Sequence, residues 1–162
     1  MEYIFRIIKP SDAPLLKEFL YLAIYVPEGE QPPAKEITER PELSRYLENW
    51  GQPGDLGFIV ELKKESKPIG AAWFRQFNKE NPGYGFVAEN IPELSIAVLP
   101  GYRGQGLGRD LLTRIINQAR LEGYPGLSLS VSKQNPAVSL YERLDFKHVR
   151  DTGDTQVMLR DL

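Results

Sequence analysis

The chain has 162 residues, of which 41% are hydrophobic and 26% charged, and its formal net charge is −2. This composition is typical of a globular protein, and the near-neutral charge argues against a general nucleic-acid binder. The absence of cysteine excludes disulfides, thiolate zinc sites and a cysteine nucleophile. We therefore expect one domain over residues 1–162 with a core of its own.

Neither a membrane span nor a targeting segment is visible in the sequence. No apolar run approaches 18 residues, and the N-terminus has no basic stretch followed by an apolar one. We therefore expect no membrane contact and, by default, a cytoplasmic location.

The first half of the chain predicts three strands and two helices, separated by segments rich in Pro, Gly and Glu. In chain order we expect a strand over 3–8, a helix capped by Ser11-Asp12 and ending at Ala23, a loop over 26–35, a helix over 41–50, and a hairpin of strands 56–62 and 68–77.

The second half predicts strands that alternate with amphipathic helices after the loop 78–89. We expect strand 91–99, helix 108–122, strand 127–131, a helix entered at Asn135-Pro136, and a final hairpin of strands 146–151 and 155–160.

The segment from Pro92 to Leu112 carries the clearest functional signal. Its apolar strand runs into a glycine-rich turn, Gly101-Tyr-Arg-Gly-Gln-Gly-Leu-Gly108, which leads directly into a helix. Glycines let several backbone N–H groups converge, and a helix start adds unpaired N–H groups with a partial positive charge. With Arg103 and Arg109 alongside, the turn predicts a socket for a di-anion such as a pyrophosphate.

Two common phosphate motifs do not fit this turn. A P-loop requires Lys-Ser or Lys-Thr after the glycines, and neither follows here. A dinucleotide fingerprint requires G-x-G-x-x-G, whereas these glycines at 104, 106 and 108 follow G-x-G-x-G.

The turn instead resembles motif A of the GNAT superfamily of N-acetyltransferases, whose signature is [QR]-x-x-G-x-[GA]. The residues from Arg103 to Gly108, Arg-Gly-Gln-Gly-Leu-Gly, match that signature position by position.

A second segment, QNPAVSLYERLDF over residues 134–146, resembles motif B of the same superfamily. The resemblance implies that Asn135 contacts the pantetheine arm of coenzyme A and that the Tyr141 hydroxyl lies near its sulfur. Taken alone, Asn135 would be read as a helix cap and Tyr141 as a packing residue. The chain departs from the motif at Asp145, where the family usually has glycine, so we expect a positive φ there at a modest stability cost.

The resemblance implies the GNAT fold: a mixed, mostly antiparallel sheet of about seven strands flanked by about four helices, with two strands parted at the cofactor site. It implies acetyl-CoA as co-substrate and no metal. It also implies that the cofactor is bound by residues of the motif A strand, of the glycine turn and of motif B. These are Ile96, Ala97 and Val98, then Arg103, Gly104, Gln105, Gly106, Leu107, Gly108 and Arg109, and finally Asn135 and Tyr141.

Acetyl transfer from a thioester to an amine requires a neutral amine, stabilisation of the developing oxyanion, and a proton for the leaving thiolate. The resemblance assigns the thiolate proton to Tyr141. Glu93, on the motif A strand, is the candidate base, acting through water. A charged residue at a strand end with no catalytic role is an equally good interpretation of Glu93, because one residue of slip would turn its side chain to the other face.

Three functions are compatible with this sequence. The first is an acetyl-CoA-dependent N-acetyltransferase, the second a non-catalytic CoA- or acyl-CoA-binding regulatory module, and the third an unrelated nucleotide-binding α/β protein. For the first, the acceptor stays open among a small-molecule amine, a protein N-terminus and a lysine side chain. Many members of the superfamily form dimers, so a homodimer is compatible with the resemblance.

Overall fold

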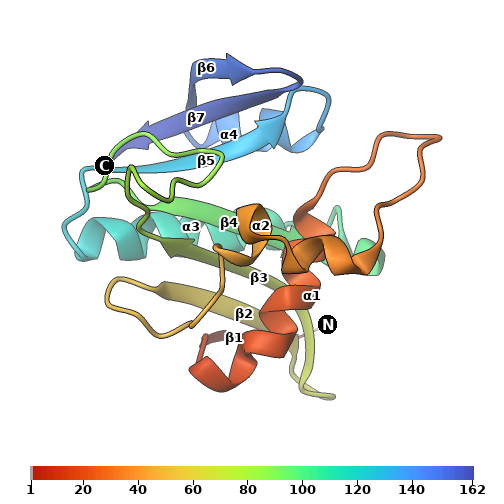
Figure 1. The fold of residues 1–162 in the computed structure, drawn as a ribbon. Coiled ribbons are helices and arrows are strands. Elements are labelled where there is room, and N and C mark those ends of the chain that lie inside the picture. The colour runs from red at the N-terminus through yellow and green to blue at the C-terminus, as the bar shows by residue number, and fades with distance from the viewer. Residues whose placement is uncertain (1) are drawn as a thin grey trace.

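The computed structural model describes residues 2–162 as seven strands and four α-helices joined by loops and short 3₁₀ turns (Figure 1). The strands are β1 (Tyr3–Ile7), β2 (Leu56–Leu62), β3 (Lys67–Arg75), β4 (Glu93–Val98), β5 (Gly126–Ser132), β6 (Lys147–Thr152) and β7 (Thr155–Asp161). The α-helices are α1 (Ala13–Ala23), α2 (Pro41–Ser44), α3 (Leu107–Leu121) and α4 (Ala137–Arg143), and the 3₁₀ turns are Pro10–Asp12, Lys35–Glu39 and Pro100–Tyr102.

The seven strands form one sheet in the order β1-β2-β3-β4-β5-β7-β6. Every neighbouring pair is antiparallel except β4 and β5, which run parallel. The expected fold class, a mixed and mostly antiparallel sheet with flanking helices, is therefore confirmed.

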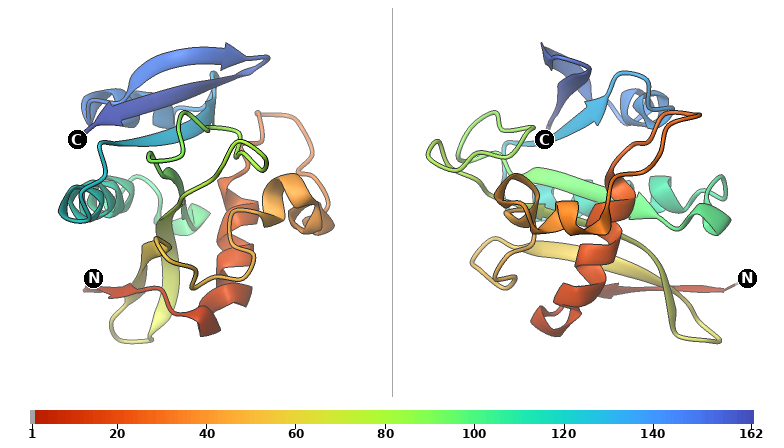
Figure 2. Two further views of the ribbon diagram at one scale, coloured as in Figure 1. Left: turned by 60° about the vertical axis from the view of Figure 1, so that its left-hand side comes forward. Right: turned by 45° about the vertical axis from the view of Figure 1, so that its right-hand side comes forward.

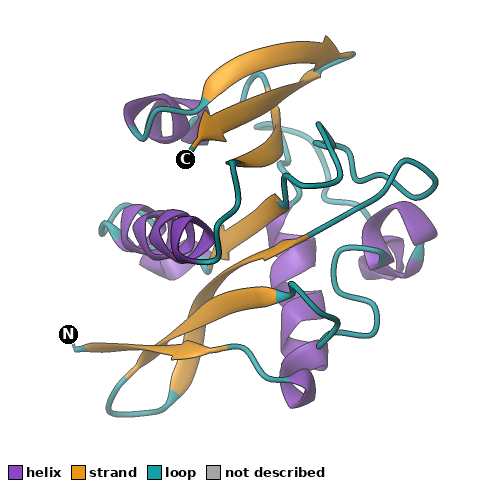
Figure 3. Ribbon diagram, turned by 90° about the vertical axis from the view of Figure 1, so that its left-hand side faces the viewer, coloured by secondary structure: helices purple, strands orange, loops and turns teal. Residues whose placement is uncertain are grey.

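Helices cover both faces of the sheet. Figure 3 shows α3 and α4 on one face and α1 and α2 on the other. Alternation along β4 explains the division, because Leu94 packs into the core beneath α3 while Ala97 packs into the core beneath α1. On α3, the buried residues recur at helical spacing and point toward the sheet: Leu107, Leu111, Leu112, Ile115, Ile116 and Ala119.

The second expected helix, over residues 41–50, is wrong in its second half. Helix α2 ends at Ser44, although the apolar residues after it keep helical spacing. In a continuing helix the carbonyls of Arg45 and Tyr46 would accept the N–H groups of residues 49 and 50. Here they accept the Arg75 guanidinium at 2.8 Å and the Trp73 indole N–H at 2.9 Å instead. These two contacts from β3 draw the segment out of helical geometry.

The remaining predicted elements differ from the structure by one or two residues at their ends. The predicted strand 91–99 begins at Glu93, and the predicted strand 68–77 ends at Arg75. Asp145 has φ = 67°, which confirms the positive φ expected where the motif usually has glycine. Within residues 2–162, no helix combines the length and the apolar character that crossing a bilayer requires.

Candidate functional site

Strands β4 and β5 touch at one end and part at the other (Figure 1). Their pairing consists of a single position, Glu93 opposite Ser128, where the Ser128 N–H donates to the Pro92 carbonyl at 3.0 Å. Toward their carboxyl ends the two strands diverge, and the N-terminus of α3 lies on the same side of the molecule (Figures 1 and 2). Loop 24–34 projects toward this side as well (Figure 1).

The parting leaves one edge of β4 without a partner strand. Leu99 N–H donates to Ile69 O at 2.8 Å, so the backbone of Leu99 faces β3. Backbone groups alternate in direction along a strand, so those of Ile96 and Val98 face the opening instead. Ala97 was expected among the cofactor-binding residues, but it pairs with Ala71 of β3 and its side chain is buried in the α1-side core.

The glycine turn at the end of β4 presents a row of free backbone donors. Gly104 and Gly106 have φ values of 76° and 85°, a region that non-glycine residues rarely adopt. The backbone N–H groups of residues 104–109 make no hydrogen bond to any other residue in the described range 2–162, and the first such bond of the helix comes from Asp110 N to Gly106 O at 3.1 Å. Six consecutive free donors at the positive end of a 15-residue helix suit a phosphate group.

Side chains tie this turn to the rest of the sheet. Arg103 Nε donates to Val98 O at 3.0 Å, so this arginine already occupies one carbonyl that faces the parting. The Tyr3 hydroxyl donates to Gln105 Oε1 at 2.8 Å and links the turn to β1. Leu107 is 2% exposed and belongs to the core, so only its backbone can contribute to binding. Arg109 and Gly108 begin α3 beside it, and Arg109 is exposed.

Helix α4 places the two predicted motif B residues beside the α3-side core. Asn135 Oδ1 accepts the Ala137 N–H at 2.9 Å, so this residue caps the helix through its carbonyl oxygen. Tyr141 is 8% exposed, and its ring packs edge-on against that of Phe146 with the ring centroids 6.0 Å apart. Burial raises the pKa of Tyr141 to about 12. Its phenol therefore stays protonated at neutral pH.

Glu93 lies at the closed end of the parting and is only 3% exposed. The Tyr46 hydroxyl donates to its Oε2 at 2.5 Å, whereas its Oε1 has no hydrogen-bond partner among residues 2–162. The N–H of Gly85 lies close enough to favour the charged carboxylate without reaching hydrogen-bond geometry. Burial outweighs these contacts and the attraction of Arg150 and Arg45, and it raises the pKa of Glu93 to about 7.

A covering loop, residues 78–91 between β3 and β4, encloses this carboxyl group. Three donors or acceptors hold the loop in place: Arg45 Nη1 bonds to the Pro82 carbonyl, Tyr84 N–H donates to the Tyr46 hydroxyl at 2.7 Å, and Arg150 Nη2 donates to Phe86 O at 2.7 Å. A Cβ atom on Gly83 would stand 2.3 Å from Glu93 Oε1, so only glycine lets the loop approach this closely.

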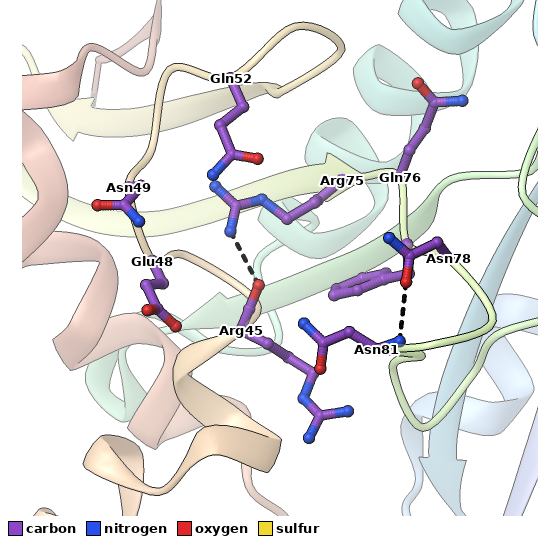
Figure 4. A pocket seen from close by; sticks show the side chains of 9 residues that line it. Arg45, Glu48, Asn49, Gln52, Arg75, Gln76, Asn78 and Asn81 are labelled. Carbon is purple, nitrogen blue, oxygen red and sulfur yellow. Dashed lines mark hydrogen bonds between the residues drawn. The ribbon is translucent and has the colours of Figure 1, made fainter.

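A separate polar hollow of about 260 Å³ lies beside α2 (Figure 4). Arg75, one of its lining residues, lies opposite Glu93 at the start of β4 in the β3–β4 pairing. Gly70 lies opposite Val98, at the end of β4 that leads into the glycine turn. Five residues of strand span about 16 Å, so this hollow lies at the opposite end of β4 from the glycine turn. Its lining consists of Arg45, Glu48, Asn49, Gln52, Arg75, Gln76, Phe77, Asn78 and Asn81.

Sequence reasoning named Glu93 but missed the residues that surround it. Tyr46 lies 47 positions away in a segment predicted to be helical, and no pattern in the sequence marks it as a partner of Glu93. Ser128 could have been found, because Gly126–Ser132 reads GLSLSVS and places three hydroxyls on one face of a strand. Over residues 2–162 no group of three or more His, Cys, Asp or Glu side chains is arranged to hold a metal ion.

Three comparisons place these features among known proteins. A sequence profile of the acetyltransferase (GNAT) family matches residues 23–146. A mycothiol acetyltransferase of Streptomyces avermitilis is 32% identical over 133 residues, which cover 82% of this chain and 38% of that protein. The [ribosomal protein bS18]-alanine N-acetyltransferase of Haemophilus influenzae is 42% identical over 63 residues, covering 39% of this chain and 43% of that protein. The match therefore spans less than half the length of these curated relatives.

Among solved structures, the Paia N-acetyltransferase of Thermoplasma acidophilum, in complex with coenzyme A, superposes with a TM-score of 0.71 at 20% identity and covers all of both chains. That likeness shows a shared fold. The profile match over most of the chain, with the 32% identity to the Streptomyces avermitilis protein, establishes that the chain belongs to the acetyltransferase (GNAT) family.

Proposed function

We propose that this protein is an acetyl-CoA-dependent N-acetyltransferase that moves an acetyl group to a primary amine within a ternary complex. The observation that carries the proposal is the row of free N–H groups over residues 104–109, placed where β4 and β5 part. A pyrophosphate needs donors of this kind, and a pantetheine arm needs unpaired strand backbone such as that of Ile96 and Val98.

In this proposal the cofactor-binding groups are those of the turn and the opening. Backbone N–H groups of residues 104–109 hold the pyrophosphate, with Arg103 and Arg109 adding positive charge. Because Arg103 bonds to Val98 O in this structure, its side chain has to yield that carbonyl if a pantetheine amide is to use it. Asn135 keeps its amide nitrogen available while its oxygen caps α4.

The chemistry follows from two buried groups with different pKa values. A protonated amine gives up one proton toward Glu93, whose pKa of about 7 suits a base at neutral pH. The neutral amine then attacks the thioester carbonyl, a C–N bond forms, the C–S bond breaks, and nitrogen loses the proton that sulfur gains.

Tyr141 serves the leaving group in this scheme. With a pKa of about 12 it remains a hydrogen-bond donor, whereas an ordinary thiol ionises near 8.5. Full proton transfer from Tyr141 to the thiolate is therefore unfavourable unless another group reprotonates the phenol. Its contribution is a hydrogen bond that stabilises the developing negative charge on sulfur.

The comparisons suggest classes of amine that could receive the acetyl group, but no single acceptor. One relative is named for mycothiol and another for an alanine of ribosomal protein bS18, so a small molecule and a protein N-terminus both stay open, as does a lysine side chain. A non-catalytic CoA-binding role is the alternative, and the buried Glu93 argues against it because a module that only binds has no need for an ionisable group in that position.

Calorimetric titration with acetyl-CoA, CoA, ATP and NAD tests the donor. We expect acetyl-CoA and CoA to bind far more tightly than ATP or NAD. Thiol release is then followed with an alanine-initiated peptide, a lysine-containing peptide, spermidine and an aminosugar. Binding without release from any amine would favour the regulatory module, and no binding of CoA by folded protein would overturn the donor assignment.

A further inference from the structure

Two buried oxygen atoms without partners lie on paired strands. Glu93 Oε1 and Ser128 Oγ each lack a hydrogen-bond partner among residues 2–162, and Ser128 is fully buried. Within residues 2–162 these two residues form the one pair of the β4–β5 ladder, so their side chains leave the sheet on the same face. Buried polar atoms nearly always bind some partner, so this pair marks a place where a small donor belongs.

The face that carries this pair is the one covered by α1 and the covering loop. Leu127 and Leu129 of β5 pack into the α3-side core. Side chains alternate along a strand, so Ser128 and Ser130 point to the opposite face, toward α1. Gly85 of the covering loop lies against the backbone of Leu129 and Ser130 on that side.

The polar side chains continue along this face into the parting. Ser95 on β4 and Ser130 on β5 each come two residues after the Glu93–Ser128 pair, and both are only partly buried. Hydroxyls therefore follow the two strands from the sealed end toward the opening. Glu93 stands three residues from Ile96, about 10 Å along the strand, which is too far for direct contact with an amine beside Ile96.

We propose that Ser128 and Glu93 together hold one water molecule, and that Ser95 and Ser130 extend from it a proton path to the acceptor amine. This inference rests on the proposed acetyltransferase function. A hydroxyl both donates and accepts, so each serine passes a proton on without changing its charge. Glu93 takes one proton from the path for each amine that loses one.

Other groups near the carboxyl fix it in place and set its charge. Tyr46 donates to Oε2. The Gly85 N–H lies near the carboxylate without reaching hydrogen-bond geometry, so Oε1 has no hydrogen-bond partner among residues 2–162 and is the atom that faces the path in this proposal. Arg45 and Arg150 attract the carboxylate from the segment after α2 and from β6. Arg75 on β3 pairs with Glu93 across the strands, but its guanidinium is bound by Asp55 at 2.8 and 2.9 Å and so adds no free charge.

The first test follows the ionisation of Glu93 by NMR in protein labelled with carbon-13 at the glutamate carboxyls. Comparison with Glu93→Gln identifies the signal, and no CoA or acceptor is needed. The replacement Ser128→Ala removes one of the two groups that hold the water and so weakens its hydrogen bond to the carboxylate. We expect the midpoint to rise by about half a unit, the size of one net hydrogen bond.

Ser132→Ala is the matched control. Ser132 lies on the same strand and the same face, and its hydroxyl already accepts the Gln134 N–H at 3.4 Å. We expect this variant to leave the midpoint unchanged. An unchanged midpoint in folded Ser128→Ala would overturn the shared water. If Ser128→Ala does not fold, a crystal structure of the unaltered protein decides, since a solvent peak bonded to both oxygens supports the proposal and a dry site contradicts it.

The kinetic test uses acetyl-CoA and whichever amine of the four-amine panel is turned over. Ser128→Ala should move the acidic limb of the pH profile in the same direction as the NMR midpoint, while the KM for acetyl-CoA stays constant. A limb that does not move removes Ser128 from the proton path. If the protein fails to bind CoA but Ser128→Ala still raises the NMR titration midpoint of Glu93, the proposed function is overturned while the proposal of a shared water stands.

Discussion

The two ends of strand β4 differ in almost every physical respect. At the carboxyl end the glycine turn is mostly exposed, has no side chain at four of its eight positions and offers backbone N–H groups. At the amino end a carboxyl group is buried beneath a loop that side chains hold from three directions. In the proposed function this difference separates binding from chemistry, because phosphate recognition needs accessible donors, whereas a base tuned to neutral pH needs exclusion from water.

Replacing Glu93 by Gln should have the largest effect of the changes that test this difference between the two ends, and the effect is on kcat. If Glu93 is the base, we expect kcat to fall by roughly 10²- to 10⁴-fold, the usual contribution of general base catalysis. The affinity for acetyl-CoA, measured by calorimetry, should stay within about twofold of that of the unaltered protein. A parallel loss of affinity would mean that the two ends of β4 are not separate in function.

The same replacement should stabilise the protein above neutral pH. The folded-state pKa of Glu93 is raised from 4.5 to about 7, so the folded state binds protons more tightly than the unfolded state does. Stability is then lost as pH rises from about 4.5 to about 7, by an amount on the order of 3 kcal/mol. Urea unfolding at pH 5 and pH 8 should show this loss, and Glu93→Gln should largely abolish it. A variant less stable than the unaltered protein at pH 8 would make Glu93 a structural residue.

Gly83→Ala tests how closely the covering loop seals the carboxyl. Its Cβ would stand 2.3 Å from Glu93 Oε1 and 2.8 Å from the Tyr46 hydroxyl, so either the loop or these two buried side chains have to shift. We expect a loss of about 1–3 kcal/mol, typical of overpacking, together with a lower pKa for the better-hydrated Glu93. Gly101→Ala is the control, since a Cβ there meets nothing within 4 Å. Unchanged stability in Gly83→Ala would show that the loop is not tightly seated.

Gly106→Ala tests the other end of the strand. A Cβ at Gly106 meets no atom, so any effect comes from its φ of 85°, which costs an alanine about 1–2 kcal/mol. We expect weaker binding of acetyl-CoA by roughly tenfold as the turn relaxes, because each 1.4 kcal/mol is a factor of ten. Gly101→Ala, at a position without positive φ, should bind normally. Equal affinities for the two variants would remove the conformation of Gly106 from the binding site.

The smallest expected effect lies outside both ends, at Asp145. Its φ of 67° follows the end of α4, and glycine adopts that conformation at lower cost. Asp145→Gly should raise the stability to unfolding by up to about 1 kcal/mol, with kcat and KM unchanged. A destabilised variant would indicate that the aspartate side chain makes a contact of its own.

What the sequence predicted well is what local chemistry determines. The strand, turn and helix from Glu93 to Leu121 lie within two residues of their expected bounds, because alternation, glycine spacing and helical periodicity are all local signals. The sheet class followed from the resemblance to a known fold. The positive φ at Asp145 followed from its place after a helix.

The parts that escaped prediction depend on distant contacts. Leu43, Tyr46 and Trp50 have the spacing of one helix face. The segment is nevertheless not helical, because side chains of β3 donate to the carbonyls of residues 45 and 46, which a helix would use for its own hydrogen bonds. The burial of Glu93 likewise arises from Tyr46 and from the covering loop, and neither contact follows from the residues next to Glu93 in the chain.

Amide hydrogen exchange with and without CoA, read residue by residue, tests the central claim most directly. The N–H groups of residues 104–109 have no acceptor among residues 2–162, so they should exchange quickly alone and slowly once CoA is bound. We expect this protection at the glycine turn and along Ile96 and Val98, with little change around the polar hollow beside α2. Protection confined to residues 45–52 and 75–81, with the glycine turn unaffected, would contradict the account.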